Sequence, residues 1–340
     1  MTLYFATVLP GLEHVLENEV RAKLADASLQ RSERGKVFFR TSLPLKALME
    51  LRTADNLYQQ IRRFRVGPHK IHLAEIERVL YELDLSLELV QTSGFIRFKV
   101  NASRAGKHTY SRFDAAEAAA AGIARRNPRL RLDPTGGHEI EFRLDLQEEE
   151  AVFSLRLTDA GFRYRHAQRS FTQAALRPSV AHALVWLSDP RAEDVVIDPC
   201  CGSGTILSER LAYPYCQIEG GDVSEAAVEA SRENIGLHER LKLRRWDARR
   251  LPVDAGYADV IVTNLPFGRQ ISADEYIPQL YRDVFKEMKR VLNDEGRMLC
   301  LTDADAALRS AADHLQLSCS EIAAIHLKGL HPTLYRLWKA

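Results

Sequence analysis

The chain has 340 residues, of which 46% are hydrophobic and 27% charged, and its formal net charge at pH 7 is +1. These values are ordinary for a soluble globular protein with room for two or three domains. No apolar run reaches the length of a membrane-spanning helix, and the first residues lack the pattern of a signal peptide, so we expect a cytoplasmic protein.

The five cysteines argue against a disulfide framework, because their number is odd and the chain is long. None of them pairs with a histidine at the spacing of metal ligands, so we expect no metal site. We expect these cysteines to be buried small residues; they are Cys200, Cys201, Cys216, Cys300 and Cys319.

Charge is distributed unevenly along the chain. Residues 1–170 contain 27 Lys and Arg against 22 Asp and Glu, whereas residues 171–340 contain 20 against 24. The strongest basic excess lies between Arg97 and Arg131, with nine basic and two acidic residues. The asymmetry suggests a polyanionic partner for the first half.

The first half alternates short strand patterns with helical patterns and predicts small α+β units. The predicted strands are 2–8, 36–40, 95–101, 138–144 and 151–157, and the predicted helices are 11–24, 45–51, 71–80 and 113–125.

The second half follows a regular strand–helix rhythm, which predicts a parallel, doubly wound sheet. Its predicted strands are 194–198, 216–222, 241–246, 258–263 and 298–302, and its predicted helices are 204–211, 225–235 and 276–292. Two further strand-like runs, 318–327 and 334–338, predict a terminal hairpin that adds one antiparallel strand.

A glycine-containing loop follows the first of these strands. It reads Asp-Pro-Cys-Cys-Gly-Ser-Gly-Thr over residues 198–205, which allows a ligand to approach the backbone closely. Leu207 stands where the nicotinamide fingerprint needs a third glycine, and the lysine of a phosphate-binding Walker loop is absent. The loop resembles the first motif of class I methyltransferases, which implies that it binds S-adenosylmethionine through Asp198, Pro199, Cys200, Gly202, Ser203, Gly204 and Thr205.

Two aspartates end the next two strands. Asp222 lies about 20 residues past the loop, where a carboxylate accepts ribose hydroxyls on this sheet topology. Methyltransferases commonly place a carboxylate at the position of Asp247, facing the adenine amino group. The predicted cofactor set is completed by Val223, Ala248 and Asn264.

The tetrapeptide Asn264-Leu265-Pro266-Phe267 follows the strand at 258–263. It resembles the [Asn/Asp/Ser]-Pro-Pro-[Tyr/Phe] motif of amino-methyltransferases, with Leu265 in place of the first proline. The resemblance implies that the Asn264 side chain and the Leu265 carbonyl accept hydrogen bonds from a planar NH2 group, while Phe267 stacks on the base. No cysteine follows Pro266, which disfavours a cysteine-nucleophile mechanism at pyrimidine C5.

An alternating basic strand runs into a glycine turn and a helix start between residues 97 and 112, a pattern that suits phosphates. Together with segments 153–158 and 161–165 it resembles the THUMP RNA-binding domain. The candidate RNA-binding residues are Arg97, Lys99, Arg104, Lys107, His108 and Arg112.

With both halves considered, the chain resembles the THUMP-domain class I methyltransferases of the TrmN/Trm14 family, which are tRNA guanine-N2 methyltransferases. The resemblance implies a ferredoxin-like domain at 1–57, a THUMP domain at 58–158, a linker at 159–171 and a Rossmann-fold methyltransferase domain at 172–340. Residues 174–179 resemble the family's helix before the sheet. The family implies methylation of guanosine N2 at position 6 of the acceptor stem by a monomer, with the THUMP domain holding the 3′ CCA end of the tRNA.

Three alternatives remain open at the level of sequence. The first is a guanosine-10 N2 methyltransferase of tRNA, and the second is an amino-methyltransferase of DNA adenine or protein glutamine. The third is a non-catalytic RNA-binding scaffold.

Overall fold

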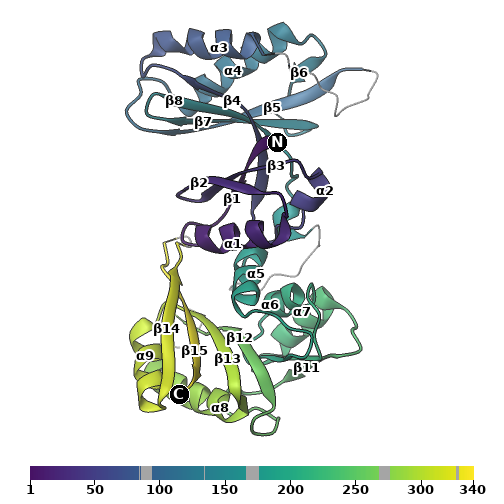
Figure 1. Cartoon of the computed structure of the whole chain (residues 1–340), viewed down its shortest axis with the longest axis vertical. Helices are drawn as coiled ribbons and strands as arrows, with labels where there is room; N and C mark the ends of the chain where they lie inside the picture. Colours follow the sequence, from purple (N-terminus) through teal and green to yellow (C-terminus); the bar gives the residue numbers. More distant parts are fainter. Residues whose placement is uncertain (84, 86–93, 134, 166–175, 268–275, 327–328) are drawn as a thin grey trace.

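The computed structural model describes residues 1–83, 85, 94–133, 135–165, 176–267, 276–326 and 329–340. The molecule is elongated and has three tiers (Figure 1). The N-terminal strands form the middle tier, residues from about 58 to 156 form one end, and the C-terminal half forms the other end. None of the helices among the described residues is long and apolar enough to cross a bilayer.

The first 156 residues build one mixed eight-stranded sheet with strand order β2-β3-β1-β4-β8-β7-β5-β6. Helices α3 and α4 pack over the β5–β8 part of the sheet, and α1 packs against the β1–β3 part (Figure 1). The strands are β1 (Thr2–Thr7), β2 (Ser28–Glu33), β3 (Lys36–Thr41), β4 (Asn56–Arg65), β5 (Ile96–Ala105), β6 (Leu130–Leu132), β7 (Ile140–Gln147) and β8 (Glu150–Arg156). The helices are α1 (Glu13–Lys23), α2 (Leu45–Leu48), α3 (Leu73–Tyr81) and α4 (Arg112–Arg126), with a 3-10 turn η1 at Lys70–His72.

Strand β4 belongs to both parts of this sheet. Its first residues, 56–59, pair with β1, and residues 58–65 pair with β8. The predicted boundary between residues 57 and 58 therefore falls inside a shared strand. The sequence patterns missed β4 because a bulge between Gln60 and Arg62 interrupts its alternation, and they missed the polar edge strand β2 and the three-residue β6.

The C-terminal half forms a seven-stranded sheet with order β11-β10-β9-β12-β13-β15-β14. Among the described strands only β15 runs opposite to the others, which confirms the doubly wound prediction and its single antiparallel strand. The strands are β9 (Val195–Asp198), β10 (Gln217–Asp222), β11 (Leu241–Arg245), β12 (Ala258–Asn264), β13 (Leu292–Thr302), β14 (Leu317–Ala324) and β15 (Thr333–Lys339). The helices are α5 (Pro178–Leu187), α6 (Thr205–Arg210), α7 (Glu225–Ile235), α8 (Ile277–Val291) and α9 (Asp305–His314).

Helix α9 was not predicted, although its buried residues Ala307, Leu308, Ala311 and Ala312 recur at helical spacing. The predicted linker at 159–171 contains a 3-10 turn, η2 (Phe162–Tyr164). Residues 166–175, which include the predicted start of the third domain at residue 172, lie outside the described residues. Within the predicted helix at 174–179, α5 begins at Pro178.

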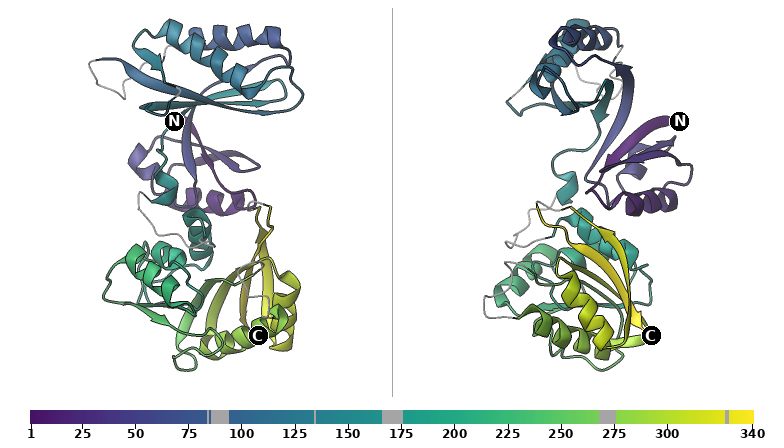
Figure 2. Two further views of the ribbon diagram at one scale, coloured as in Figure 1. Left: turned by 180° about the vertical axis from the view of Figure 1, so that it is seen from behind. Right: turned by 90° about the vertical axis from the view of Figure 1, so that its left-hand side faces the viewer.

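The N-terminal unit is joined to the C-terminal sheet through a shared hydrophobic core. Val15 and Leu16 of α1 belong to the same buried cluster as Val180 and Leu184 of α5. The β14–β15 hairpin makes a second contact, where the His326 amide donates to the Pro10 carbonyl at 3.2 Å. Both views in Figure 2 show α5 and this hairpin reaching the N-terminal unit.

Buried polar groups also connect the two units. Within the N-terminal unit, Glu19 of α1 accepts the amide hydrogens of Arg52 and Thr53, at 2.8 and 2.9 Å. The Thr53 hydroxyl lies 2.9 Å from His182 of α5, whose other ring nitrogen lies 2.6 Å from the Tyr213 hydroxyl. Because these buried groups are paired across the boundary, the interface has a defined geometry.

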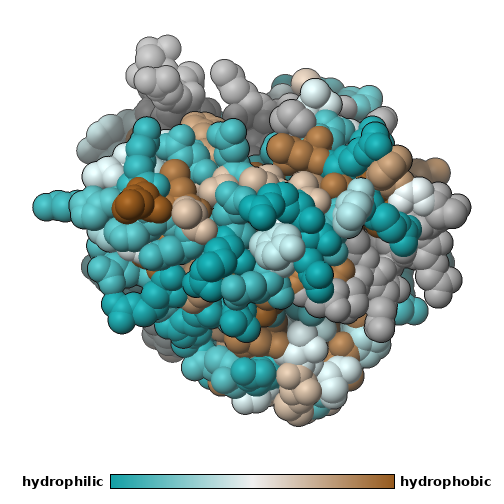
Figure 3. All heavy atoms as spheres, turned by 90° about the horizontal axis from the view of Figure 1, so that it is seen from above, coloured by the Kyte–Doolittle hydropathy of each residue, from teal (hydrophilic) through white to brown (hydrophobic). Residues whose placement is uncertain are grey.

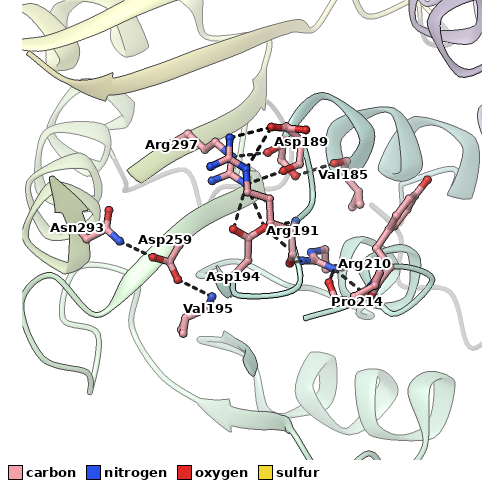
Figure 4. Close-up of polar contacts among 12 residues, drawn as sticks. Val185, Asp189, Arg191, Asp194, Val195, Arg210, Pro214, Asp259, Asn293 and Arg297 are labelled. Atoms are coloured by element: carbon pink, nitrogen blue, oxygen red, sulfur yellow. Dashed lines mark hydrogen bonds and ion pairs between the residues drawn. The ribbon is translucent and has the colours of Figure 1, made fainter. Parts of the chain in front are cut away.

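At the amino edge of the C-terminal sheet, one buried carboxylate holds two buried arginines (Figure 4). Asp194 accepts from Arg297 of β13 at 3.0 Å and from Arg210 of α6 at 3.3 Å. Arg297 also donates to the carbonyls of Ser188 and Asp189, just after α5. The cluster ties the end of α5, the end of α6 and β13 to the start of β9.

The face seen from above is predominantly hydrophilic, with hydrophobic residues only in small separate groups (Figure 3).

The expectation for the cysteines is correct for Cys201 and Cys300, which are buried. It is wrong for Cys216, which is exposed just before β10, and Cys200 and Cys319 are partly exposed.

Candidate active site

The carboxyl ends of β9 and β12 lie side by side at the point where the sheet order reverses. From β9 the sheet continues to β10 on one side, while β12 pairs with β9 on the other. Such a switch point leaves a crevice at the carboxyl edge, and ligands of doubly wound sheets bind there. Asp198 ends β9 and Asn264 ends β12, so the glycine loop and the tetrapeptide begin at the same place.

The glycine loop makes a tight turn over β10. The Gly204 amide donates to the Cys201 carbonyl at 2.8 Å, and the Cys201 amide donates to the Gly221 carbonyl of β10 at 2.9 Å. Gly202 and Gly204 both have positive φ, at 52° and 79°. A Cβ on Gly204 would lie 2.7 Å from Ile235 of α7, whereas a Cβ on Gly202 would point into open space. Gly204 is thus needed for packing, and Gly202 leaves its outer side open to a ligand.

Asp198 is almost fully buried, and this burial raises the pKa of its carboxyl group to about 7, although the Thr263 hydroxyl and the Cys200 amide act in the opposite direction. One carboxylate oxygen accepts the Cys200 amide at 3.2 Å. The other is buried and has no hydrogen-bond partner of good geometry among the described residues. A buried oxygen without a partner carries a free-energy cost that a ligand donor would remove.

The two strand-end aspartates lie on neighbouring strands, because Asp222 pairs in register with Arg245, two residues before Asp247. Asp222 accepts the Gly202 and Ser224 amides at 3.1 and 3.0 Å, which fixes its carboxylate against the loop. A carboxylate has about four acceptor sites, so it retains capacity for ribose hydroxyls.

Asp247 is paired with Arg249 at 2.7 Å, and these hydrogen bonds lower the pKa of its carboxyl group. An adenine amino group would therefore share this carboxylate with the guanidinium. Of the two other predicted cofactor residues, Val223 follows Asp222 and is 64% exposed, so it leaves an apolar surface beside that carboxylate. Ala248, which follows Asp247, is partly buried.

The tetrapeptide leaves an acceptor free at the switch point. The Asn264 side-chain oxygen is buried and has no hydrogen-bond partner among the described residues. The Leu265 side chain is fully buried and its amide donates to the Leu301 carbonyl of β13 at 3.0 Å. A proline at position 265 would lack this N–H, which gives a physical reason for the departure from the double-proline motif.

Phe267 is only 6% exposed. Stacking of this ring on a base stays a prediction, because so small an exposed fraction leaves little of the ring accessible. The prediction needs the ring to become exposed when substrate binds.

The residues at this edge fit S-adenosylmethionine. The cofactor has a cationic ammonium group, ribose hydroxyls and an adenine ring. The unpartnered Asp198 oxygen, the Asp222 carboxylate and the exposed Val223 side chain offer matching partners, and Gly202 keeps the loop surface free of a side chain. The fit rests on donor and acceptor types and on the open side of the loop.

The candidate RNA-binding residues do not form one group. Arg104, Lys107, His108 and Arg112 surround the turn between β5 and α4, where Arg104 donates to the His108 carbonyl at 2.9 Å. Arg97 lies at the opposite end of β5, roughly 23 Å away at 3.3 Å per strand residue. Arg97 is exposed between Asp133 and Glu139, and Lys99 is half-buried.

The structure adds residues that the sequence patterns did not select. The Lys70 amide donates to the Thr109 hydroxyl at 2.9 Å, and the Thr109 amide donates to the Pro68 carbonyl at 2.8 Å. These bonds place exposed Lys70 and His69 beside the β5–α4 turn, although Lys70 and Thr109 lie 39 residues apart in the chain. At the cofactor edge, the Trp246 indole donates to the Pro199 carbonyl at 3.0 Å and supports the loop.

Two family models match this chain. Residues 164–333, half of the chain, match the RMKL-like methyltransferase domain, and residues 4–57 match the RlmL ferredoxin-like domain.

Individual relatives cover the chain to different extents. The tRNA (guanine(6)-N(2))-methyltransferase THUMP3 from Bos taurus is 28% identical over 262 residues, covering 71% of this chain and 51% of the relative. The chain thus spans about half the length of that animal relative. The tRNA (guanine(6)-N2)-methyltransferase of Thermus thermophilus is 29% identical over 324 residues and 90% of each chain. The crystal structure of TrmN from Thermus thermophilus superposes over the full length of both chains with a TM-score of 0.85 and 26% identity.

Proposed function

This chain belongs to the RMKL-like methyltransferase domain family, and we propose that it methylates the N2 amine of a guanosine in tRNA, with S-adenosylmethionine as methyl donor. The observation that carries the proposal is the Asn264 side-chain oxygen, which lies at the switch point beside the glycine loop and has no hydrogen-bond partner among the residues that the structure describes. A buried amide oxygen at this point suits an NH2 group as its donor. The relatives named as tRNA guanine-N2 methyltransferases support guanine as the base that carries it.

The cofactor-binding residues act on one edge of the sheet. Asp198 receives a cationic group, Asp222 receives hydroxyls, and Gly202 allows the ligand to approach the loop backbone. When bound, S-adenosylmethionine supplies a methyl group on a positively charged sulfur. The reaction therefore requires neither a nucleophilic side chain nor a metal ion from the protein.

Asn264 and the Leu265 carbonyl orient the amine. By accepting its N–H groups they hold the amine in one position and leave its lone pair free to attack, which removes orientational freedom from the barrier. The same acceptors favour the developing positive charge on nitrogen, because the N–H groups become stronger donors as that charge forms.

The proposal also names the methylated nucleotide and the part of the chain that holds the tRNA. We infer methylation at position 6 of the acceptor stem, supported by the relatives that are tRNA (guanine(6)-N2)-methyltransferases. Residues 58–158 serve as a THUMP domain that holds the 3′ CCA end, and the cluster around Arg104, Lys107 and Lys70 contacts phosphates. The chain acts as a monomer.

Incubation of the protein with isotopically labelled S-adenosylmethionine and unmodified tRNA tests the assignment. The label should appear in N2-methylguanosine after nuclease digestion and mass spectrometry, and it should disappear from transcripts in which guanosine 6 is replaced by adenosine. Label at guanosine 10 or on adenine would instead support one of the alternatives.

Replacement of Asn264 should separate chemistry from cofactor binding. Asn264→Ala should reduce kcat on the order of 100-fold, the effect of losing a positioned contact, while the cofactor Kd stays within about twofold. Asn293→Ala, on β13 at the opposite edge of the sheet, is the matched control and should retain wild-type kcat. Equal losses of turnover and cofactor affinity in Asn264→Ala would mean that the residue is only structural.

A further inference from the structure

A buried hydroxyl contacts the tetrapeptide from behind. Tyr281 lies on α8, is fully buried, and belongs to the same hydrophobic cluster as Leu265. Its hydroxyl oxygen lies 3.1 Å from the Pro266 carbonyl oxygen and 2.6 Å from the Thr302 hydroxyl at the end of β13. The Thr302 oxygen in turn accepts the Ala304 amide at 2.9 Å.

Chemistry sets the direction of these hydrogen bonds. The Pro266 carbonyl can only accept, so the Tyr281 O–H donates to it, and the Tyr281 oxygen then accepts from the Thr302 hydroxyl. The Ala304 amide can only donate, so it donates to Thr302. The result is a series of hydrogen bonds in which every donor points the same way, from Ala304 through Thr302 and Tyr281 to Pro266, and each bond strengthens the next. Burial raises the pKa of the Tyr281 phenol, so Tyr281 remains a donor at neutral pH.

The chain of hydrogen bonds anchors one side of the acceptor peptide. The other side is anchored by the Leu265 amide, which donates to Leu301 of β13 at 3.0 Å. Between these anchors lies the peptide bond from Leu265 to Pro266, which has no N–H and offers only the Leu265 carbonyl. That carbonyl is the second acceptor assigned to the substrate amine.

We propose that Tyr281, held by Thr302, is a positioning residue for methyl transfer that sets the orientation of the Leu265 carbonyl. The inference rests on the proposed function of the tetrapeptide as an amine acceptor. Tyr281 does not touch substrate or cofactor; it acts through the peptide that does. Loss of its hydroxyl lowers kcat and leaves the affinities for cofactor and RNA intact.

Tyr281→Phe tests this, because it removes one oxygen and keeps the ring. We expect kcat to fall about tenfold, the effect of one lost hydrogen bond, with cofactor and tRNA Kd values within about twofold of wild type. Thr302→Val, which removes the hydroxyl that donates to Tyr281, should also lower kcat. Thr302→Ser keeps a hydroxyl and should therefore keep a kcat close to wild type. Tyr335→Phe is the matched control: Tyr335 is buried in the same cluster, but its ring faces Arg309 of α9, so kcat should be unchanged.

Hydrogen exchange of the Leu265 amide gives a readout that does not depend on the substrate. We expect faster exchange in Tyr281→Phe than in wild type or Tyr335→Phe, even if methylation occurs at another nucleotide, an outcome that would overturn only the proposed function. The positioning role is overturned if Tyr281→Phe keeps both wild-type kcat and wild-type Leu265 exchange. It is also overturned if kcat falls only in proportion to the loss of folded protein, or if Tyr335→Phe has the same effect.

Discussion

Asp198 shows how burial can prepare one residue for a ligand. Its carboxyl group has one oxygen paired with the Cys200 amide, and the other has no hydrogen-bond partner of good geometry in the part of the chain that the structure describes. Burial raises the pKa of this carboxyl group to about 7. The ionised form is costly in this site without a cation, because it lacks solvent. A cationic group placed beside it removes that cost, so binding and deprotonation are linked.

Cofactor affinity should therefore depend on pH. The pKa of Asp198 without ligand is about 7, and a bound cation lowers it, so binding releases a proton below pH 7 and weakens as the pH falls. The Kd for S-adenosylmethionine should fall about tenfold between pH 6 and pH 8, following the ionised fraction of Asp198. Isothermal titration calorimetry checks this, and Asp198→Asn should bind weakly with little pH dependence. A steep dependence that persists in Asp198→Asn would assign the titration to another group.

The stability of the unliganded protein changes with pH in the opposite direction to its cofactor affinity. The folded pKa of Asp198 lies above the ordinary value of 3.8, so the fold holds a proton that the unfolded chain has lost. The resulting contribution to stability is present below about pH 4 and is lost as the pH rises through 7. The site thus favours cofactor binding over the stability of the unliganded fold.

At the scale of elements, the two edges of the C-terminal sheet have different roles. The carboxyl edge has an open loop surface and holds buried oxygens of Asp198 and Asn264 that lack hydrogen-bond partners within the described ranges, whereas the amino edge is tied by the paired cluster of Asp194, Arg210 and Arg297 (Figure 4). Removal of one member leaves buried charges without partners, which costs more than the pairing contributes. The amino edge therefore stabilises the strands that carry the site.

Asp194→Ala should destabilise the protein by about 3–5 kcal/mol, because two buried guanidinium groups lose their carboxylate. Asp294→Ala is the matched control: its partner is Lys339 at 3.0 Å, but the Asp294 side chain is 97% exposed. Since exposed pairs contribute little, its free energy of unfolding should change by less than about 1 kcal/mol. Urea denaturation measures both variants, and equal shifts would contradict the structural role of the cluster.

At the scale of the whole molecule, the middle tier connects the RNA-binding candidates to the catalytic sheet. Strand β4 links it to β8 in one direction, and the shared core of α1 and α5 links it to the catalytic sheet in the other. Because both connections are buried and hydrogen-bonded, a tRNA end held near the β5–α4 turn would lie at a defined distance from Asn264.

Charge reversal at that turn should weaken RNA binding. Arg104→Glu with Lys107→Glu should raise the tRNA Kd and reduce the slope of log K against log salt by about two, one for each phosphate that the variant no longer neutralises. Arg336→Glu with Lys339→Glu reverses the same number of charges on β15 and serves as the control. Unchanged affinity and slope in the first variant, measured by filter binding across a salt series, would place the RNA elsewhere.

Features of the site that depend on local chemistry could be predicted from the residue pattern. The Asp-Pro-Cys-Cys-Gly-Ser-Gly-Thr loop, the strand-end aspartates and the tetrapeptide could be placed because turns, strand alternation and helix starts are properties of adjacent residues. The doubly wound sheet followed from the same rhythm, and membership in a methyltransferase family agrees with it.

Features that join residues far apart in the chain became visible in the folded structure alone. It merged the two N-terminal units through β4, separated Arg97 from Arg104 along β5, exposed Cys216 and brought Lys70 to the β5–α4 turn. It also placed Tyr281 behind Pro266, buried Asp198 deeply enough to raise its pKa, and covered Phe267. Burial and contact between residues far apart in the chain arise from packing, and no local pattern of residues records them.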